Sequence, residues 1–314
     1  HYSEILHTSD GKYTNAIFTM FRSMLALFRA VKPEYAVFVF DKTRNTFRST
    51  QLHAEMYTAQ RTEPPQPLKA QFAGVDEALS QIGFTVLCGD DYEADDYAAS
   101  VIRKFEDPGL RILVHTKDHD YEQLVSDHTR LWRQVDKDKA ETLKNAYGLF
   151  AGNEGYAALP AGIFEYTADI VNAEEGVMPS QIPDLWGIVG DPSDGIPGCR
   201  GVSSAAAPLI REYGSIAHIY EAIDACENDA KKEKALSAFW KENLGISRSP
   251  LKSLKENRAD VLLSRQLAVM KDDIALPCTL DDLRMQTDPA PYLRIFDQYE
   301  LSSISADVKK KGIC

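Results

Sequence analysis

Residues 35–41 read Tyr-Ala-Val-Phe-Val-Phe-Asp, an apolar run of strand length that ends on a carboxylate. Upstream of this run, apolar residues recur at intervals of three and four and predict a helix with one buried face. These residues are Ile17, Met20, Phe21, Met24, Phe28 and Val31. Pro33 ends that helix, because proline cannot continue the backbone hydrogen bonding. A buried helix followed at once by an apolar strand is typical of an α/β fold.

The same alternation continues downstream. Helical spacing recurs over residues 68–82 and from about residue 93 to residue 105, and apolar strands are expected at 85–88 and 111–115. Strands that are apolar on both faces and alternate with helices indicate a parallel arrangement covered on both sides. The fold class predicted is therefore α/β, with a mostly parallel central sheet flanked by helices.

The pattern changes near residue 181, where short helical segments broken by glycine and proline begin. This change predicts an α/β core over residues 1–180 and a helical C-terminal lobe over residues 181–314. Within the core, the stretch near 140–175 is interpreted as an insertion.

Composition restricts the class of function. The 314 residues include 35 Lys or Arg and 47 Asp or Glu, a net charge of −12, which argues against holding nucleic acid by bulk positive charge. A nuclease with a carboxylate metal site stays open. Five cysteines without a Cys-x-x-Cys pair argue against structural zinc and favour an intracellular, reducing compartment: the cytoplasm with its nucleoid, or an organelle. No apolar run approaches the ~20 residues of a membrane span, so no membrane partner is expected.

Eight acidic residues stand where a parallel sheet would bring them together. The first ends the strand at 35–40, three open the helix that starts near 93, and two follow the strand at 111–115. Because the carboxyl ends of parallel strands meet at one edge, these six are expected at one rim. The stretch Gly190-Asp-Pro-Ser-Asp-Gly195 adds two more if the second lobe folds back over that rim. The eight are Asp41, Glu93, Asp95, Asp96, Asp118, Asp120, Asp191 and Asp194.

So many carboxylates at one rim need a countercharge. Mg²⁺ or Mn²⁺ prefers oxygen ligands, and two such ions about 4 Å apart can clamp the attacking and leaving oxygens of a phosphodiester. Each motif alone has a structural interpretation, since acids complement a helix N-terminus and Asp-x-Asp is common in turns. Only their joint placement favours metal. The spacing of His115 and His119 does not predict zinc, because His115 falls in an expected strand.

Several motifs occur in a recognisable order. They are Phe40-Asp41, Tyr92-Glu-Ala-Asp-Asp96, Thr116-Lys-Asp-His-Asp-Tyr-Glu-Gln-Leu-Val-Ser-Asp127, Gly190-Asp-Pro-Ser-Asp-Gly-Ile-Pro-Gly198 and, near the end, Leu263-Ser-Arg-Gln-Leu-Ala268. With them the chain resembles, over nearly its whole length, the 5′–3′ exonuclease domain of bacterial DNA polymerase I and the flap-endonuclease-like 5′ nucleases. The resemblance implies a PIN-like or 5′-nuclease-like α/β core followed by a helix-hairpin-helix lobe.

The same resemblance implies a function and a set of site residues. The function is two-metal cleavage of phosphodiesters at the 5′ ends or flaps of DNA, with RNA left open as a substrate. The eight acids above would bind two Mg²⁺ or Mn²⁺ ions, and the catalytic residues would be Asp41, Arg48 and Arg61. An arch over about 42–67 would grip the 5′ strand, and a helix-hairpin-helix over 198–213 would hold duplex phosphates. The nucleic-acid-binding residues implied are Arg48, Tyr57, Arg61, Gly198, Gly201 and Ser203.

Departures from the family favour an alternative. The family begins with a strand that ends in Asp-Gly and supplies another metal ligand, whereas this chain starts at His1, after that strand. Thr58 replaces a usual arch lysine, His119 replaces a usual basic residue, and the hairpin segment 201–206 lacks a glycine and a lysine. The alternative is a weakened or inactive 5′-nuclease-like subunit that binds nucleic acid or acts as a scaffold in a larger assembly. Retention of all eight acids favours the enzyme.

Overall fold

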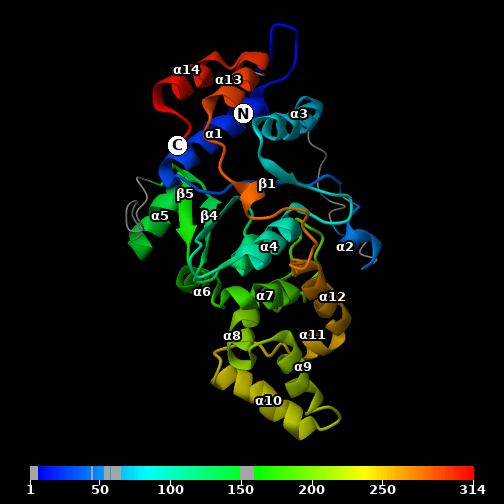
Figure 1. The fold of residues 1–314 in the computed structure, drawn as a ribbon. Coiled ribbons are helices and arrows are strands. Elements are labelled where there is room, and N and C mark those ends of the chain that lie inside the picture. Colours follow the sequence, from blue (N-terminus) through cyan, green and yellow to red (C-terminus); the bar gives the residue numbers. More distant parts are fainter. Residues whose placement is uncertain (1–5, 44, 53–56, 58–64, 149–158) are drawn as a thin grey trace.

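The computed structural model describes residues 6–43, 45–52, 57, 65–148 and 159–314 (Figure 1). The α/β part forms one end of an elongated molecule and the helical lobe forms the other. Helices of the α/β part are α1 (Asn15–Val31), α2 (Phe47–Thr50), α3 (Gln66–Ile82), α4 (Ala94–Phe105), α5 (Lys137–Tyr147) and α6 (Ala168–Glu175), with the 3₁₀ turn η1 (Asp120–Leu124). Its strands are β1 (Val37–Val39), β2 (Thr85–Leu87), β3 (Ile112–Thr116), β4 (Thr129–Gln134) and β5 (Ile163–Tyr166).

The strands form two short sheets. β1 pairs with β2 in parallel, while β3 pairs with β4 in parallel and β4 pairs with β5 antiparallel. The predicted α/β class, with mostly parallel pairing and flanking helices, is confirmed. In the described residues the strands form two sheets, and no ladder joins β1–β2 to β3–β5. Residues of β1 are half-buried rather than buried on both faces.

The first predicted helix is confirmed as α1, whose apolar face is buried. The C-terminus of α1 is fixed by local contacts. Lys32 adopts a left-handed conformation with φ of 51°, and its N–H donates to the carbonyl of Phe28. Pro33 follows. Phe21 and Phe28 of this helix pack in a cluster with Phe84 and Phe296, where the rings of Phe21 and Phe296 lie edge to face at 5.1 Å.

The last two helices complete this cluster. α13 (Pro289–Gln298) and α14 (Ser302–Lys311) pack against α1 and α3, at the end of the molecule away from the helical lobe (Figure 1). Residues 289–311 were predicted to be part of the helical lobe. The structure instead adds them to the α/β part, because Ile295 and Val308 bury their side chains there.

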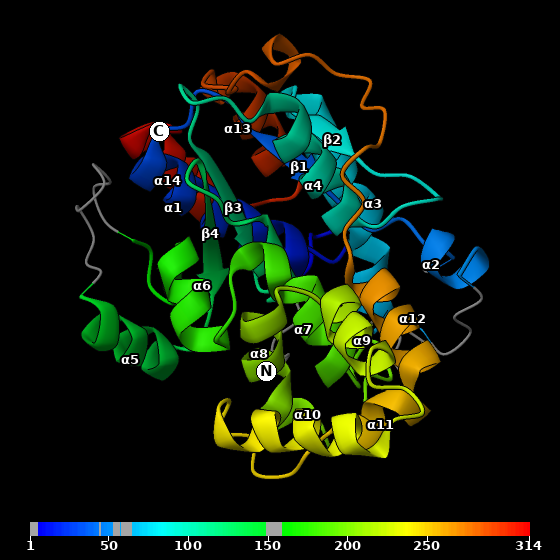
Figure 2. The same ribbon diagram turned by 90° about the horizontal axis from the view of Figure 1, so that it is seen from below.

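The helical lobe occupies the middle of the second half of the chain. Its helices are α7 (Ile182–Val189), α8 (Ser203–Tyr213), α9 (Ile216–Asp224), α10 (Ala230–Glu242), α11 (Leu251–Glu256) and α12 (Arg258–Ala268). Viewed from below, α8 to α12 lie in front of the α/β part (Figure 2). Helices α7 and α12 pack closely, because Gly187 leaves room: a Cβ there would lie 2.9 Å from the Cβ of Arg265.

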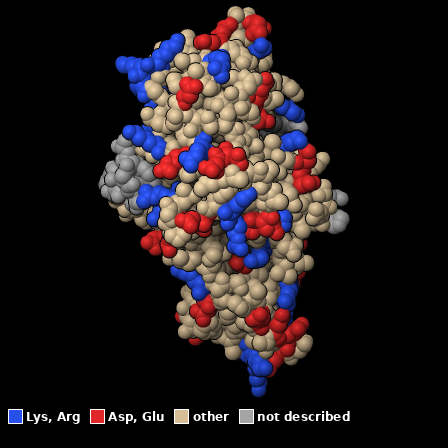
Figure 3. Space-filling view, viewed as in Figure 1, with Lys and Arg blue, Asp and Glu red and all other residues tan. Residues whose placement is uncertain are grey.

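The surface carries both signs of charge. In Figure 3 the Lys and Arg side chains are interspersed with the Asp and Glu side chains over both parts of the molecule. Within the described residues, no helix has the length and apolar character needed to cross a membrane.

Candidate metal centre

A small hollow gathers most of the predicted metal ligands. Its volume is about 50 Å³, and it lies where β1, β3 and the start of α4 meet the helical lobe. Six of the eight predicted carboxylates line it: Asp41, Glu93, Asp95, Asp118, Asp120 and Asp194. The sequence thus identified a set of acids that the fold brings together from four separate segments.

One group of acids joins the two parts of the molecule. Carboxylate oxygens of Asp120, Asp191 and Asp194 lie within 4.8 Å of one another. Asp191 and Ile196 exchange two backbone hydrogen bonds of 3.0 and 2.8 Å, which fold residues 191–196 into a tight loop after α7. Burial, reinforced by the negative charges of Asp118, Asp194 and Asp191, raises the pKa of Asp120 to about 8. This group therefore favours a bound cation.

Asp41 and Asp95 lie at the start of α4. The N–H of Ala94 donates to Asp41 at 2.7 Å, which fixes the Asp41 carboxylate at the helix N-terminus. Burial raises the pKa of Asp95 well above its usual value, an effect that Arg48 opposes and that Asp96 and Glu93 reinforce. The hydrogen bond from Ala94 holds one oxygen of Asp41, and Asp41 is otherwise exposed.

Arg48 is buried, with 1% of its surface exposed, behind the acids of α4. Its Nη atoms donate to Glu93 at 3.2 Å and to both oxygens of Asp96 at 2.7 and 2.8 Å. Its other two bonds reach the carbonyls of Leu267 at 3.0 Å and Val269 at 3.1 Å. A guanidinium has five N–H donors, and these five bonds use them all.

This placement differs from the exposed position that the predicted catalytic and nucleic-acid-binding role of Arg48 requires. With every donor engaged inside the protein, Arg48 has none left for a phosphate. The sequence showed a positive charge beside the acids but not its burial, because the partners at 267 and 269 are distant in the chain. Asp96 is likewise enclosed, since it also accepts from the N–H groups of Glu93 and Lys271.

Tyr57 is buried too, with 6% of its surface exposed. Its hydroxyl donates to Glu93 at 3.1 Å, and its ring packs with Ile196 and Leu267. Burial and the charge of Glu93 raise the pKa of Tyr57 above its ordinary value, so the hydroxyl stays protonated and acts as a donor. Tyr57, which the sequence placed in the arch, therefore holds Glu93 from inside the protein. Arg61 lies outside the described residues.

The three predicted hairpin contacts fall into two groups. Gly198 is buried and its N–H donates to Ser264 at 2.8 Å. A Cβ on Gly198 would lie 2.4 Å from the nitrogen of Gly190, so this glycine serves a close backbone crossing rather than a phosphate. Gly201, with φ of 75° and open space around it, and Ser203, at the start of α8, are exposed.

Three further residues complete the site. Trp186 of α7 packs on His119 with ring centroids 4.7 Å apart. Ser264 and Leu267 of α12 bind Gly198 and Arg48 as described above. Ser264 and Leu267 lie in the motif at 263–268, so the sequence offered a means to predict them as site residues. No local pattern predicted Trp186.

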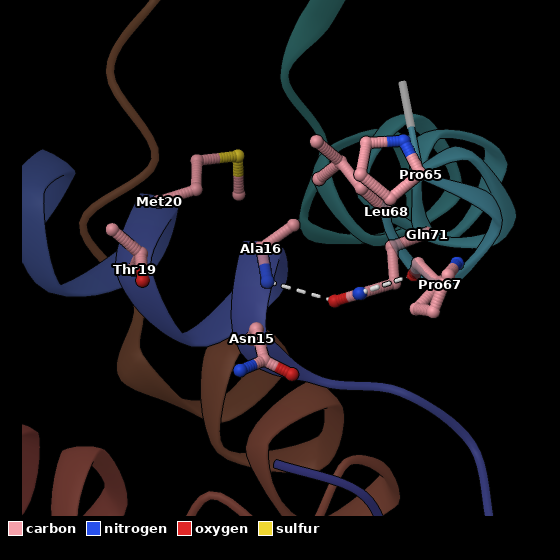
Figure 4. A pocket seen from close by; sticks show the side chains of 8 residues that line it. All are labelled: Asn15, Ala16, Thr19, Met20, Pro65, Pro67, Leu68 and Gln71. Atoms are coloured by element: carbon pink, nitrogen blue, oxygen red, sulfur yellow. Dashed lines mark hydrogen bonds between the residues drawn. The ribbon is translucent and has the colours of Figure 1, made fainter. Parts of the chain in front are cut away.

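A larger hollow, of about 530 Å³, lies away from the acids, between α1 and α3 (Figure 4). Gln71 joins the two helices there, accepting from the N–H of Ala16 at 2.7 Å and donating to the carbonyl of Pro67 at 2.6 Å. None of the described residues that line this hollow has a titratable side chain, so those residues offer no group for acid–base or metal chemistry. Its lining residues are Asn15, Ala16, Thr19, Met20, Pro65, Pro67, Leu68 and Gln71.

The donor set of the metal centre fits a hard divalent cation. Its ligand atoms are carboxylate oxygens, which Mg²⁺ and Mn²⁺ prefer. Among the described residues, Asp118, Asp120 and Asp191 form no ion pair with a lysine or arginine. By contrast, Glu93 and Asp96 share the single positive charge of Arg48. The charge near Asp120 is therefore the part that a metal ion would balance.

Two family models match the chain. The model for the 5′–3′ exonuclease, N-terminal resolvase-like domain matches residues 1–148, and that for the 5′–3′ exonuclease, C-terminal SAM fold matches residues 177–290. DNA polymerase I of Mycobacterium bovis is 30% identical over 95% of this chain and 28% of the polymerase. This chain thus spans under a third of that relative. A 5′–3′ exonuclease of Aquifex aeolicus is 29% identical over 95% of this chain and 92% of its own length.

Solved structures share the fold. T5 5′-exonuclease with bound divalent metal ions (zinc) has a TM-score of 0.55 at 18% identity, covering 81% of this chain and 82% of its own. The catalytic core of Rad2 in complex with DNA substrate has a TM-score of 0.52 at 14% identity, covering 91% and 79%. The resolvase-like core and the SAM-like helical lobe agree with the predicted fold class.

Proposed function

Because the chain belongs to the 5′–3′ exonuclease family, we propose that it is a metal-dependent 5′ nuclease that cleaves phosphodiesters at the 5′ ends or flaps of DNA. The observation that carries the proposal is the meeting of Asp120 with Asp191 and Asp194. One acid comes from the α/β part and two come from the helical lobe. Three carboxylates this close repel one another unless a cation lies between them.

Two sets of carboxylates would hold the ions. Asp118, Asp120, Asp191 and Asp194 form the first set, and Asp41 and Asp95 form the second. Bound Mg²⁺ or Mn²⁺ would supply Lewis acidity towards the phosphodiester, which two ions can share. The divalent ions bound to T5 5′-exonuclease support the proposal of a metal ion here. The complex of Rad2 with DNA substrate supports the proposal of a DNA substrate.

Other residues of the chain would position the ligands. The N–H of Ala94 holds one oxygen of Asp41, and Tyr57 and Arg48 hold the two oxygens of Glu93. These bonds fix the carboxylates before substrate arrives, which lowers the reorganisation needed during reaction. Arg61 remains the arginine proposed to contact the 5′ strand.

The non-catalytic alternative is less well supported. A scaffold subunit would have no use for uncompensated buried acids, whose mutual repulsion lowers stability. The relatives named DNA polymerase I support a role in DNA replication or repair. The free state of all five cysteines supports a reducing compartment, and the DNA substrate requires that this compartment contain DNA.

Cleavage of a 5′-labelled flap DNA tests the proposal. We expect cleavage with Mg²⁺ or Mn²⁺ and none with EDTA, because the acids alone cannot stabilise a phosphodiester undergoing attack. Metal should also raise the melting temperature in a calorimetric scan, by an amount equivalent to about 2.7 kcal/mol at 100 times the Kd. Metal-loaded protein that binds the flap but leaves it uncut would favour the scaffold instead.

The start of α8 is the proposed duplex contact. Gly201 and Ser203 present an exposed backbone at a helix N-terminus, where N–H groups can bind phosphate. The family's usual lysine falls at Ala205, but Ala205 is 3% exposed, so a charge at that position would be buried. Ser204, one residue earlier, is exposed and is the place where a charge can be added.

The variant Ser204→Lys is expected to bind flap DNA more tightly and to steepen the salt dependence of binding by about one unit of slope, since it adds one phosphate contact. Fluorescence anisotropy with labelled flap DNA at several salt concentrations measures both effects. Ser302→Lys, the same change at the start of α14, is the control and should leave the slope unchanged. Equal slopes for the two variants would remove the start of α8 from the duplex interface.

A further inference from the structure

His119 lies between two proposed metal ligands and is not used by the function above. It directly precedes η1, and a third of its side chain is exposed. Its Nδ1 lies 3.8 Å from an oxygen of Asp118, and its Nε2 lies 3.6 Å from an oxygen of Asp120. Both separations are too long for hydrogen bonds. The imidazole nitrogens therefore face the acids without being bonded to them.

These separations suit ligands of one ion. Donors that each bind a metal at about 2.0–2.2 Å lie no more than roughly 4 Å apart. Either ring nitrogen, with the carboxylate it faces, meets that condition. Asp118, His119 and Asp120 also offer ligand atoms that all lie within 4.8 Å of one another. The imidazole is thus close enough to share an ion with an adjacent carboxylate.

Trp186 packs against the imidazole of His119. The two rings meet edge to face at an interplanar angle of 83°. The indole nitrogen of Trp186 is buried and has no hydrogen-bond partner within the part of the chain that the structure describes. Ring packing therefore orients His119, and it leaves both imidazole nitrogens on the side of the acids.

We infer that His119 is a nitrogen ligand of the metal centre, and that it gives the site a preference for Mn²⁺ over Mg²⁺. The inference rests on the proposed function and deepens it. Mg²⁺ favours oxygen donors and keeps several waters, so a nearby imidazole adds little to its binding. Mn²⁺ also takes oxygen ligands, but as a first-row transition ion it accepts an imidazole nitrogen more readily than Mg²⁺ does. His119 thus selects between two ions that the acids alone would treat alike.

The test compares the two ions by titration calorimetry with MnCl₂ and MgCl₂ on the full chain. His119→Phe keeps a ring against Trp186 and removes both nitrogens. It is expected to weaken Mn²⁺ binding by about tenfold to a hundredfold and Mg²⁺ binding by less than about threefold. His119→Gln is the second variant, and it should show the same selective loss. His218→Asn, at an exposed histidine of α9, is the control and should bind both ions as the natural chain does.

Three outcomes would overturn the inference. Unchanged Mn²⁺ binding in both variants would show that His119 is not a ligand. Equal losses for Mn²⁺ and Mg²⁺ would show that it only positions the carboxylates. Either result leaves the proposed function standing, provided that the natural chain binds Mg²⁺ and cleaves flap DNA. Failure of the natural chain to bind either ion would instead overturn the inference and the proposed function together.

Discussion

Asp118→Asn and Asp191→Asn are each expected to lower the Mg²⁺-dependent cleavage rate of flap DNA by about two to three powers of ten. An amide carries no charge to balance a divalent ion, and the loss of several kcal/mol of transition-state stabilisation corresponds to a change of that size. Single-turnover cleavage at saturating DNA measures the rate. Asp297→Asn, at an exposed position of α13, should cleave like the natural chain.

Both variants should remain folded, for reasons visible in their hydrogen bonds. Asp118 accepts from the N–H of Asp120 at 3.0 Å, and Asp191 accepts from the N–H of Ser193 at 2.8 Å. An amide oxygen can accept the same bonds. Removing one negative charge should also raise the melting temperature of the metal-free protein, because it relieves repulsion. Undiminished cleavage by both variants would exclude these two acids from the mechanism.

Arg48→Met is expected to lower the free energy of unfolding by about 3–5 kcal/mol, the usual cost of removing one member of a buried ion pair. The substitution leaves Glu93 and Asp96 buried without their countercharge, and it frees the carbonyls of Leu267 and Val269. Urea unfolding followed by circular dichroism measures the change. Arg48→Lys keeps the charge but offers three donors instead of five, so it should fall between Met and the natural chain.

The matched control is Arg103→Met. Arg103 faces Asp272 at 3.8 Å on the surface, where an ion pair contributes less than about 1 kcal/mol. The DNA affinity of Arg48→Met is the second measurement, and it distinguishes a structural role of Arg48 from a role in binding phosphate. If Arg48 gripped the substrate instead, Arg48→Met would unfold at the same urea concentration as the natural chain and only its DNA affinity would fall.

The parts of the fold that the sequence predicted are those with strong local signals. The helix at 93–105 was predicted because acids open it and apolar residues recur along it, and α4 begins within one residue of that position. Strand β4 was missed, since Arg130, Arg133 and Gln134 interrupt the apolar pattern. Strand β5 was missed because Glu165 interrupts its apolar run and because it lies in the stretch interpreted as an insertion. The local pattern of apolar residues predicts the type of an element. It does not predict which short polar stretch pairs with a neighbouring strand in a sheet.

The candidate site shows the same division. Acids at the ends of strands could be grouped from the sequence, because the geometry of parallel strands brings those ends together. The burial of Arg48 and Tyr57 could not be predicted, since it depends on residues 267–269, more than 200 positions away. Likewise, the sequence placed residues 289–311 in a helical lobe, and it did not indicate that they pack on α1.

The packing of α13 and α14 against α1 has a consequence during synthesis. The first helix leaves the ribosome long before its last partners, because most of the 314 residues lie between them. At about 5–20 residues per second, the part of α1 that α13 and α14 cover stays exposed on the order of tens of seconds, whereas α3 can pack on α1 earlier. The nascent chain is therefore exposed to chaperones and to aggregation throughout that interval. Translation rate, rather than stability alone, should govern the yield of soluble protein.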